Sequence, residues 1–205
     1  MSNRQRGFTL IELLIGMAIV GILLAMGVPA YRGFLANSKI RNTASSIQDG
    51  LQEARSEAIK RNQSVEFLLF SQSGTDYNAT LVNAVTANTS GPSWLVRTQD
   101  PSTGLYTHID WKNGFTGSAQ SSANVNTVTT TINATYPATF GSVIFNGLGG
   151  TSLGSQAIFD VNDPTAGACA ADGGPVRCLR VQVSVAGQVH LCDPATSAPD
   201  TRACD

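Results

Sequence analysis

The sequence GFTLIELLIGMAIVGILLAMGVP, residues 7–29, decides how this chain is organised. Between Phe8 and Val28 the only charged residue is Glu12. A helix over that stretch measures about 31 Å at 1.5 Å per residue, close to the ~30 Å hydrocarbon core of a bilayer. A carboxylate inside such a segment costs on the order of 3 kcal/mol, so charged residues there usually serve a function. The pattern therefore predicts a membrane helix in which Glu12 has a role of its own.

The helix is predicted to continue past Pro29 and to become amphipathic. Small and apolar residues recur at alternating steps of four and three: Ile40, Ala44, Ile47, Leu51, Ala54 and Ala58. Such spacing marks one face of an α-helix that packs on a domain, while polar residues occupy the opposite face. We expect one helix from about Thr9 to Arg61, with a bend or local melting near residues 27–33 and a left-handed end at Asn62.

The rest of the chain is predicted to form an antiparallel sheet. Short β-branched or aromatic runs, several of alternating polarity, indicate strands at 65–70, 79–85, 94–98, 105–111, 125–131, 143–145, 156–161, 178–185 and 188–192. Residues 113–124 are expected to be a loop, and Ala186-Gly187 a hairpin turn. The fold class is therefore α+β, with one long N-terminal helix packed against an antiparallel β-sheet.

Charge and composition narrow the class of protein. Only 13% of the residues are charged and the formal net charge is −1, whereas a nucleic-acid-binding protein usually carries a basic stripe. Arg4 and Arg6 precede the apolar run. Because positively charged flanks stay on the cytoplasmic side, the remainder of the chain is expected to be exported.

The four cysteines lie close together near the C-terminus, at positions Cys169, Cys178, Cys192 and Cys204. An even number in an oxidising compartment predicts disulfides, and four cysteines allow three pairings. The sequential pairing closes two short loops that each contain Gly or Pro. A zinc site is the rival interpretation, but no C-x-x-C spacing occurs. We therefore expect disulfides and no metal.

The sequence contains no recognisable catalytic set. His108 and His190 are its only histidines, and neither has a Ser/His/Asp or Cys/His spacing around it. Both are expected to be half-exposed strand residues, and Trp94 and Trp111 are expected to be core residues. The prediction is a non-enzymatic protein without a cofactor.

The N-terminus resembles the processing site of type IV prepilins and type II secretion pseudopilins, because Gly7, Phe8 and Glu12 stand at that site's offsets. The resemblance implies that a prepilin peptidase cuts after Gly7, that the new terminal Phe8 is N-methylated, and that Glu12 guides docking into a filament. Pro29 falls where pilins carry a helix-bending proline. A signal anchor or secretory signal peptide is the alternative, but a secretory signal is cut after its apolar region.

Two further segments are similar to minor pilins and pseudopilins of the GspH/FimT type. Residues 51–62 (LQEARSEAIKRN) resemble the end of their long helix. Residues 143–147 (VIFNG) and 179–192 resemble the C-terminal segment and hairpin that follow in that family. The resemblance implies a pilin fold.

The same resemblance implies three parts: a leader peptide at 1–7, a transmembrane and filament-core half-helix at 8–35, and a periplasmic globular domain at 36–205. Such a subunit spans the bacterial inner membrane once and later enters an extracellular pilus. Its implied partners are other minor and major pilins, the prepilin peptidase, the inner-membrane pilus assembly platform, and membrane lipid before assembly.

The main hypothesis is a minor type IV pilin in a tip or initiation complex, which supports pilus assembly and hence twitching motility or adhesion. One alternative is a type II secretion pseudopilin, although the C-terminal cysteines favour the pilus. Another is a DNA-binding minor pilin for natural transformation. Relatives that bind DNA use a Gly-Arg-x-Arg element, and residues 187–190 here read GQVH. DNA binding is therefore disfavoured, although Arg177, Arg180 and Arg202 leave a modest basic patch.

Overall fold

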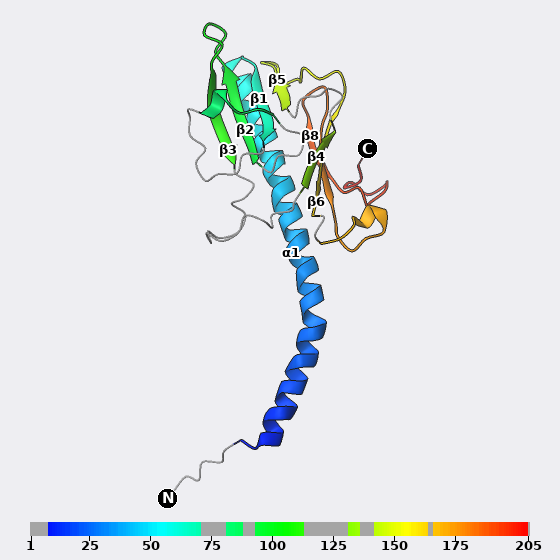
Figure 1. Cartoon of the computed structure of the whole chain (residues 1–205). Coiled ribbons are helices and arrows are strands. Elements are labelled where there is room, and N and C mark those ends of the chain that lie inside the picture. Colours follow the sequence, from blue (N-terminus) through cyan, green and yellow to red (C-terminus); the bar gives the residue numbers. More distant parts are fainter. Residues whose placement is uncertain are drawn as a thin grey trace, which may run out of the picture.

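The computed structural model describes residues 8–70, 81–87, 93–112, 131–135, 142–163 and 166–204. A long helix, α1 (Leu10–Arg61), dominates this part of the chain. Its second half is flanked by β-strands on two sides, and its first half extends away from them (Figure 1). The N-terminal end of α1 therefore lies far from the strands.

Both ends of α1 have local sequence causes. Thr9 is the N-cap, with extended backbone angles and a side chain that accepts a hydrogen bond from the backbone of the first turn. Asn62 is the C-cap in the left-handed conformation (φ 49°, ψ 42°), as expected from the sequence. The predicted helix is thus confirmed at both ends. The backbone stays helical through residues 27–33, so the expected local melting is absent and α1 follows a smooth curve in Figure 1.

Within the described ranges the strands form two four-stranded antiparallel sheets rather than the one sheet predicted. The order in the first, sheet A, is β3 (Tyr106–Lys112), β2 (Ser93–Gln99), β1 (Val65–Phe70), β5 (Ser142–Phe145). The order in the second, sheet B, is β4 (Thr131–Thr135), β6 (Ala157–Asn162), β7 (Leu179–Val183), β8 (Val189–Cys192). The sheets cover α1 from two sides, and strands of both contact it (Figure 1).

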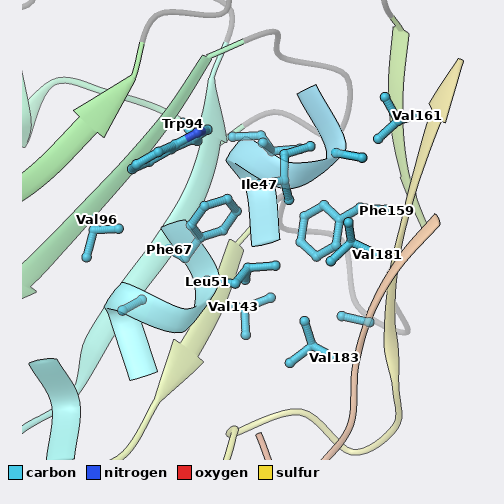
Figure 2. Packing of buried hydrophobic residues seen from close by; sticks show 14 of the residues in the cluster. Ile47, Leu51, Phe67, Trp94, Val96, Val143, Phe159, Val161, Val181 and Val183 are labelled. Atoms are coloured by element: carbon cyan, nitrogen blue, oxygen red, sulfur yellow. The ribbon is translucent and has the colours of Figure 1, made fainter. Parts of the chain in front are cut away.

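One core joins the helix to both sheets. The predicted helical stripe from Ile40 to Ala58 is completely buried. The Phe67 ring of sheet A packs edge-on against Phe159 of sheet B, with ring centroids 5.9 Å apart (Figure 2). Trp94 packs beside Phe67 and donates its indole N–H to Ser46 Oγ at 2.9 Å. The expectation that Trp94 is a core residue is therefore confirmed.

Sheet A also buries part of its outer face, which sequence reasoning did not anticipate. Leu68, Phe70 and Leu95 pack there against Val82 and Val85. The strand predicted at 79–85 is wrong where the structure describes it, because η1 (Leu81–Asn83) is a turn of 3₁₀-helix. The segment lies across the sheet instead of pairing with it, since its apolar side chains face the outer side of β1 and β2.

The other strand predictions have mixed outcomes. Seven of them agree with β1, β2, β3, β5, β6, β7 and β8 to within two residues at either end. The strand predicted at 125–131 falls almost entirely outside the described residues, and β4 begins at Thr131, where that prediction ended. The loop predicted at 113–124 also lies outside the described residues.

Candidate assembly site

Where its side chains are described, the first half of α1 exposes almost all of its apolar residues. Each of the following is at least 54% exposed: Phe8, Leu10, Ile11, Leu13, Leu14, Ile15, Met17, Ile19, Val20, Ile22, Leu23 and Leu24. A continuous apolar surface of this extent marks a site of interaction with protein or membrane. Of the residues that the structure describes, none form a helix with both the length and the apolar character needed to cross a membrane.

Glu12 lies at the start of this surface and forms a capping box with Thr9. The Thr9 hydroxyl oxygen accepts from the Glu12 backbone N–H at 3.3 Å, and Glu12 Oε2 accepts from the Thr9 backbone N–H at 3.4 Å. This pair was not among the predictions from sequence, although T-x-x-E is the signature of a capping box. The carboxylate is thereby held in the first turn of the helix, close to Phe8 in sequence.

The other predicted N-terminal residues are placed as follows. Phe8 precedes the N-cap and is 88% exposed. Gly7, the predicted cleavage position, lies outside the described residues. The backbone at Pro29 is helical, and its side chain is outside the described part. The structure thus places Phe8 and Glu12 at the same end of α1, with Pro29 well inside the helix.

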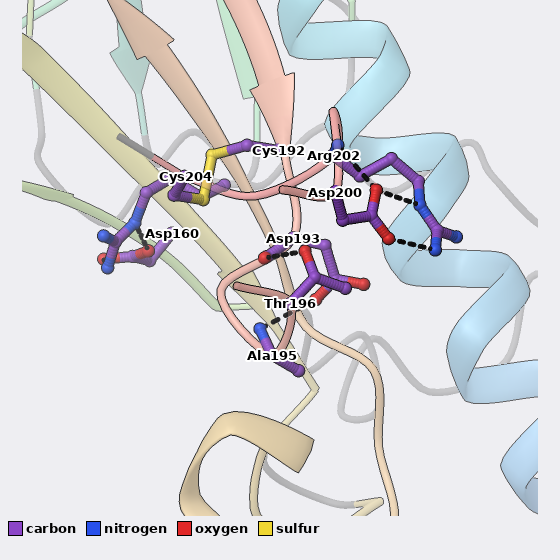
Figure 3. The surroundings of a disulfide bond; sticks show 9 residues. Asp160, Cys192, Asp193, Ala195, Thr196, Asp200, Arg202 and Cys204 are labelled. Carbon is purple, nitrogen blue, oxygen red and sulfur yellow. Dashed lines mark hydrogen bonds and ion pairs between the residues drawn. A yellow bond between two sulfur atoms is a disulfide. The ribbon is translucent and has the colours of Figure 1, made fainter. Parts of the chain in front are cut away.

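The four cysteines form two disulfides, Cys169–Cys178 and Cys192–Cys204. Of the three pairings open to the sequence, this is the sequential one. The first closes the turn before β7, and the second ties the C-terminal tail to the end of β8 (Figure 3). The disulfides therefore order the C-terminal region next to sheet B.

Asp193 organises the tail between the two cysteines of the second disulfide. It is only 3% exposed, and its carboxylate accepts a hydrogen bond from Arg177 Nε. The same carboxylate accepts from the Ala195 backbone N–H (Figure 3). Its own backbone N–H donates to the Arg202 carbonyl at 2.7 Å. Sequence reasoning missed Asp193, although Asp followed by Pro after a strand is a turn signal.

The three arginines of the predicted basic patch are each paired with a carboxylate. Arg177 pairs with Asp193, Arg180 Nε lies 2.6 Å from Asp160 Oδ1, and Arg202 Nη2 lies 2.7 Å from Asp200 Oδ2. The bond that Arg202 donates lowers the pKa of Asp200 to about 2, so this carboxyl is ionised at neutral pH. Because each of these three cations has an anion beside it, the three arginines together present no net positive charge to DNA phosphates.

The histidines do not belong to a metal centre in the described part of the chain. His108 is exposed on β3, and His190 is exposed on β8 opposite Gln182. The described residues contain no cluster of three or more His, Cys, Asp or Glu side chains that is able to hold a metal ion.

The segments that resemble the GspH/FimT type, residues 51–62, 143–147 and 179–192, meet at the end of α1. Arg55 Nε donates to the Gly149 carbonyl at 3.1 Å. A Cβ on Gly187, whose φ is +77°, would lie 1.9 Å from the same carbonyl oxygen, and a Cβ on Gly147 would lie 2.5 Å from Asn62 Oδ1. The helix end, the turn after β5 and the β7–β8 hairpin therefore form one junction that connects the two sheets.

Comparison with known families identifies the chain. Residues 2–28 match the prokaryotic N-terminal methylation motif. Residues 43–187 match the family described as type II transport protein GspH. The chain belongs to this GspH family, and the predicted membership of the GspH/FimT group of minor pilins and pseudopilins is confirmed.

Sequence relatives are fimbrial proteins. The chain is 48% identical over 50 residues to a fimbrial protein of Moraxella nonliquefaciens, which covers 24% of this chain and 32% of that protein. It is 46% identical over 52 residues to the type IV major fimbrial protein FimA of Dichelobacter nodosus, covering 25% and 32%. The chain thus matches about a third of the length of these curated relatives. The methylation motif and these relatives indicate a pilus- or membrane-anchored subunit.

A solved minor pilin structure shares the fold. The type IV minor pilin FimU of Pseudomonas aeruginosa matches 80% of this chain and 94% of its own, with a TM-score of 0.50 and 17% identity. The minor pseudopilin EpsH of the type 2 secretion system of Vibrio cholerae matches 77% and 99%, with a TM-score of 0.45 and 11% identity. The likeness to FimU confirms the predicted α+β pilin fold, in which a long N-terminal helix packs on antiparallel strands.

Proposed function

We propose that this chain is a minor type IV pilin, a non-enzymatic structural subunit of a tip or initiation complex that supports pilus assembly and hence twitching motility or adhesion. The observation that carries the proposal is the contrast between the two halves of α1. The second half has its apolar stripe completely buried, whereas the first half exposes an apolar surface with Glu12 in its first turn. A helix built in this way requires other molecules around its first half.

The proposed division of the chain follows that contrast. Residues 1–7 are a leader that the prepilin peptidase removes between Gly7 and Phe8, after which Phe8 is N-methylated. Residues 8–35 pass once through the inner membrane and later enter the filament core. Residues 36–205 form the periplasmic domain. The inner-membrane assembly platform transfers the subunit from lipid to other minor and major pilins.

Glu12 is proposed to pair with the terminal amine of Phe8 on a neighbouring subunit. A carboxylate in apolar surroundings needs a cation or a proton. Cleavage after Gly7 creates an amine on the residue that precedes the Thr9 cap. The bonds between Thr9 and Glu12, at 3.3–3.4 Å, are long ones, so the carboxylate is able to exchange them for a neighbouring cation.

The test replaces Glu12 by Gln, which removes the charge and keeps the shape. We expect incorporation into sheared pili to fall on the order of tenfold, because an unpartnered amine then remains in an apolar interface. Asp49→Asn, an exposed carboxylate on the second half of α1, is the matched control and is expected to leave incorporation unchanged. Normal incorporation of the Glu12→Gln chain at wild-type abundance contradicts the proposed role of Glu12.

A type II secretion pseudopilin is the second candidate, favoured by the match to the family of type II transport protein GspH. Deletion of the gene separates the two functions. Loss of surface pili with normal release of exoproteins supports the pilin, and the reverse result supports the pseudopilin. The carboxylate partners of Arg177, Arg180 and Arg202 weigh against a DNA receptor.

A further inference from the structure

A groove with a volume of about 410 Å³ lies between α1 and the end of sheet B. It begins on the helix where the exposed first half ends, and its opposite wall comes from β7, β8 and the C-terminal tail. Apolar side chains and arginines line it together: Phe34, Leu179, Leu191, Arg41, Arg177 and Arg202. The backbone N–H of Arg177 donates to Asn37 Oδ1 at 2.8 Å, which fixes the two walls relative to each other.

The position of the groove along α1 indicates which layer of the membrane lies beside it before assembly. This inference rests on the proposed function. The distance from Phe8 to Leu35 along a helix is about 40 Å, close to the thickness of a bilayer with its headgroups. Tyr31 and Phe34 are 62% and 69% exposed, and aromatic side chains of membrane proteins gather at the headgroup level. The groove therefore opens beside the headgroup layer when residues 8–35 are inserted.

The charges of the groove favour an anionic occupant. Arg177 and Arg202 each have a carboxylate partner. Arg41 is exposed, and the described part of the chain shows no hydrogen bond or ion pair for it. Three arginines and two carboxylates leave one excess positive charge, which complements a phosphodiester. Arginine is suited to this role because its planar guanidinium binds two phosphate oxygens at once.

We propose that this groove binds the headgroup of an anionic phospholipid while the subunit waits in the inner membrane. The phosphate contacts Arg41 and Arg202, and the start of the acyl chains lies against Phe34, Leu179 and Leu191. Figure 3 shows Arg202 on the side of the tail that faces α1. Such a contact sets the depth and rotation of the globular domain on the membrane surface, so that Glu12 of each waiting subunit is held at one level.

The experiment measures lipid selectivity on the purified full chain in detergent by native mass spectrometry. Phosphatidylglycerol and phosphatidylcholine with identical acyl chains are offered at equal concentration. We expect the wild-type chain to retain phosphatidylglycerol preferentially. Arg41→Gln with Arg202→Gln is expected to lower that preference about 25-fold, at about fivefold for each arginine near an anionic lipid.

The control is Lys60→Gln with Arg61→Gln, which also removes two cations from the chain, at the far end of α1 where both pair with Glu57. This control is expected to keep the wild-type preference. Equal binding of the two lipids by the wild-type chain overturns the proposal, as does a double variant that keeps its preference. A double variant that keeps the preference but no longer enters pili identifies the groove as a contact between subunits and also overturns it.

The lipid assay involves no pilus, so its failure is distinct from failure of the proposed function. A chain without lipid preference that is still incorporated through Glu12 remains a minor pilin. If the chain prefers phosphatidylglycerol through Arg41 and Arg202 but never enters a filament, the lipid site is supported and the proposed function is contradicted.

Discussion

Arg97 Nε lies 2.7 Å from Glu66 Oε2, and the two residues stand directly opposite each other on β2 and β1. The pair is buried under the segment that crosses the outer face of sheet A. Arg97 Nη1 donates to the carbonyls of Val82 and Val85 at 2.8 and 3.3 Å, and the guanidinium carbon lies 3.8 Å from the centre of the Tyr106 ring. One side chain therefore fastens this segment to the sheet.

Replacing Arg97 by Ala is expected to lower the free energy of unfolding by about 3–5 kcal/mol, because Glu66 is left as a buried charge without its partner. Chemical denaturation of the full chain in detergent measures the loss. Arg180→Ala removes a more exposed pair with Asp160 and is expected to cost about 1 kcal/mol or less. Equal losses in the two variants would show that burial of the Arg97 pair is unimportant.

Glu53 of α1 and Asp110 of β3 are neighbouring carboxyl groups, and the charged form of Glu53 destabilises the fold. Burial, the hydrogen bond with Asp110 and the negative charges of Asp110 and Glu57 raise the pKa of Glu53 above its ordinary value of 4.5. The folded chain therefore holds this proton at pH values where the unfolded chain has lost it, and stability falls as the pH rises through the raised pKa.

We expect Glu53→Gln to melt at a higher temperature than the wild type at pH 7, because it removes a charge that the folded state disfavours. The difference should shrink as the pH falls toward 4.5, where the wild-type carboxyl also becomes protonated. Thermal melts of both chains across this pH range measure it. A lower melting temperature for the variant at pH 7 would contradict the prediction that the charge of Glu53 destabilises the fold.

Glu57, one turn further along α1, is the matched control with the opposite sign. Hydrogen bonds from Arg61 and Lys60 lower the pKa of Glu57, so its charged form stabilises the fold. Glu57→Gln is therefore expected to lower the melting temperature at neutral pH. If both glutamine variants shift the melting temperature in the same direction, these charges do not govern the effect.

Gly187→Ala tests the junction at the end of α1. An added Cβ would lie 1.9 Å from the Gly149 carbonyl oxygen at a residue with φ of +77°, so both a clash and backbone strain are introduced. We expect a loss of about 2–4 kcal/mol in the free energy of unfolding. Gly104 has a similar φ of +73° and open space around it, so Gly104→Ala should cost only about 1 kcal/mol.

Removal of the Cys192–Cys204 disulfide by serine substitution tests the tail. The bond joins residues 12 apart in sequence, and closing such a loop contributes about 3 kcal/mol. The loss also frees the tail that carries Arg202, so the preference for phosphatidylglycerol should fall with stability. Replacing Cys169 and Cys178 should cost a similar amount of stability and less of that preference, because the tail that carries Arg202 stays tied to β8. Equal lipid selectivity in the two variants would show that the tail does not contribute to lipid binding in the groove.

Much of the helix was predictable because its causes are local. The stripe from Ile40 to Ala58, the Asn62 cap and the exposed apolar run need only the 3.6-residue period of one helix. The capping box of Thr9 and Glu12 is equally local, because it needs only two residues three apart in the sequence. Most strand positions follow in the same way from alternation of side chains within a few residues.

The sequence by itself determined the long helix, its ends, most of the strands and the family. The tertiary structure alone decided that the strands divide into two sheets, that residues 81–87 cross the outer face of sheet A, and which of three cysteine pairings forms. It also decided that Arg177, Arg180 and Arg202 each meet a carboxylate, and that Arg41 faces the tail across a groove. The physical reason is the separation along the sequence of the residues that interact. Helix periodicity and capping act between residues a few positions apart. Sheet order, ion pairs and grooves depend on which distant segments meet once the core has formed.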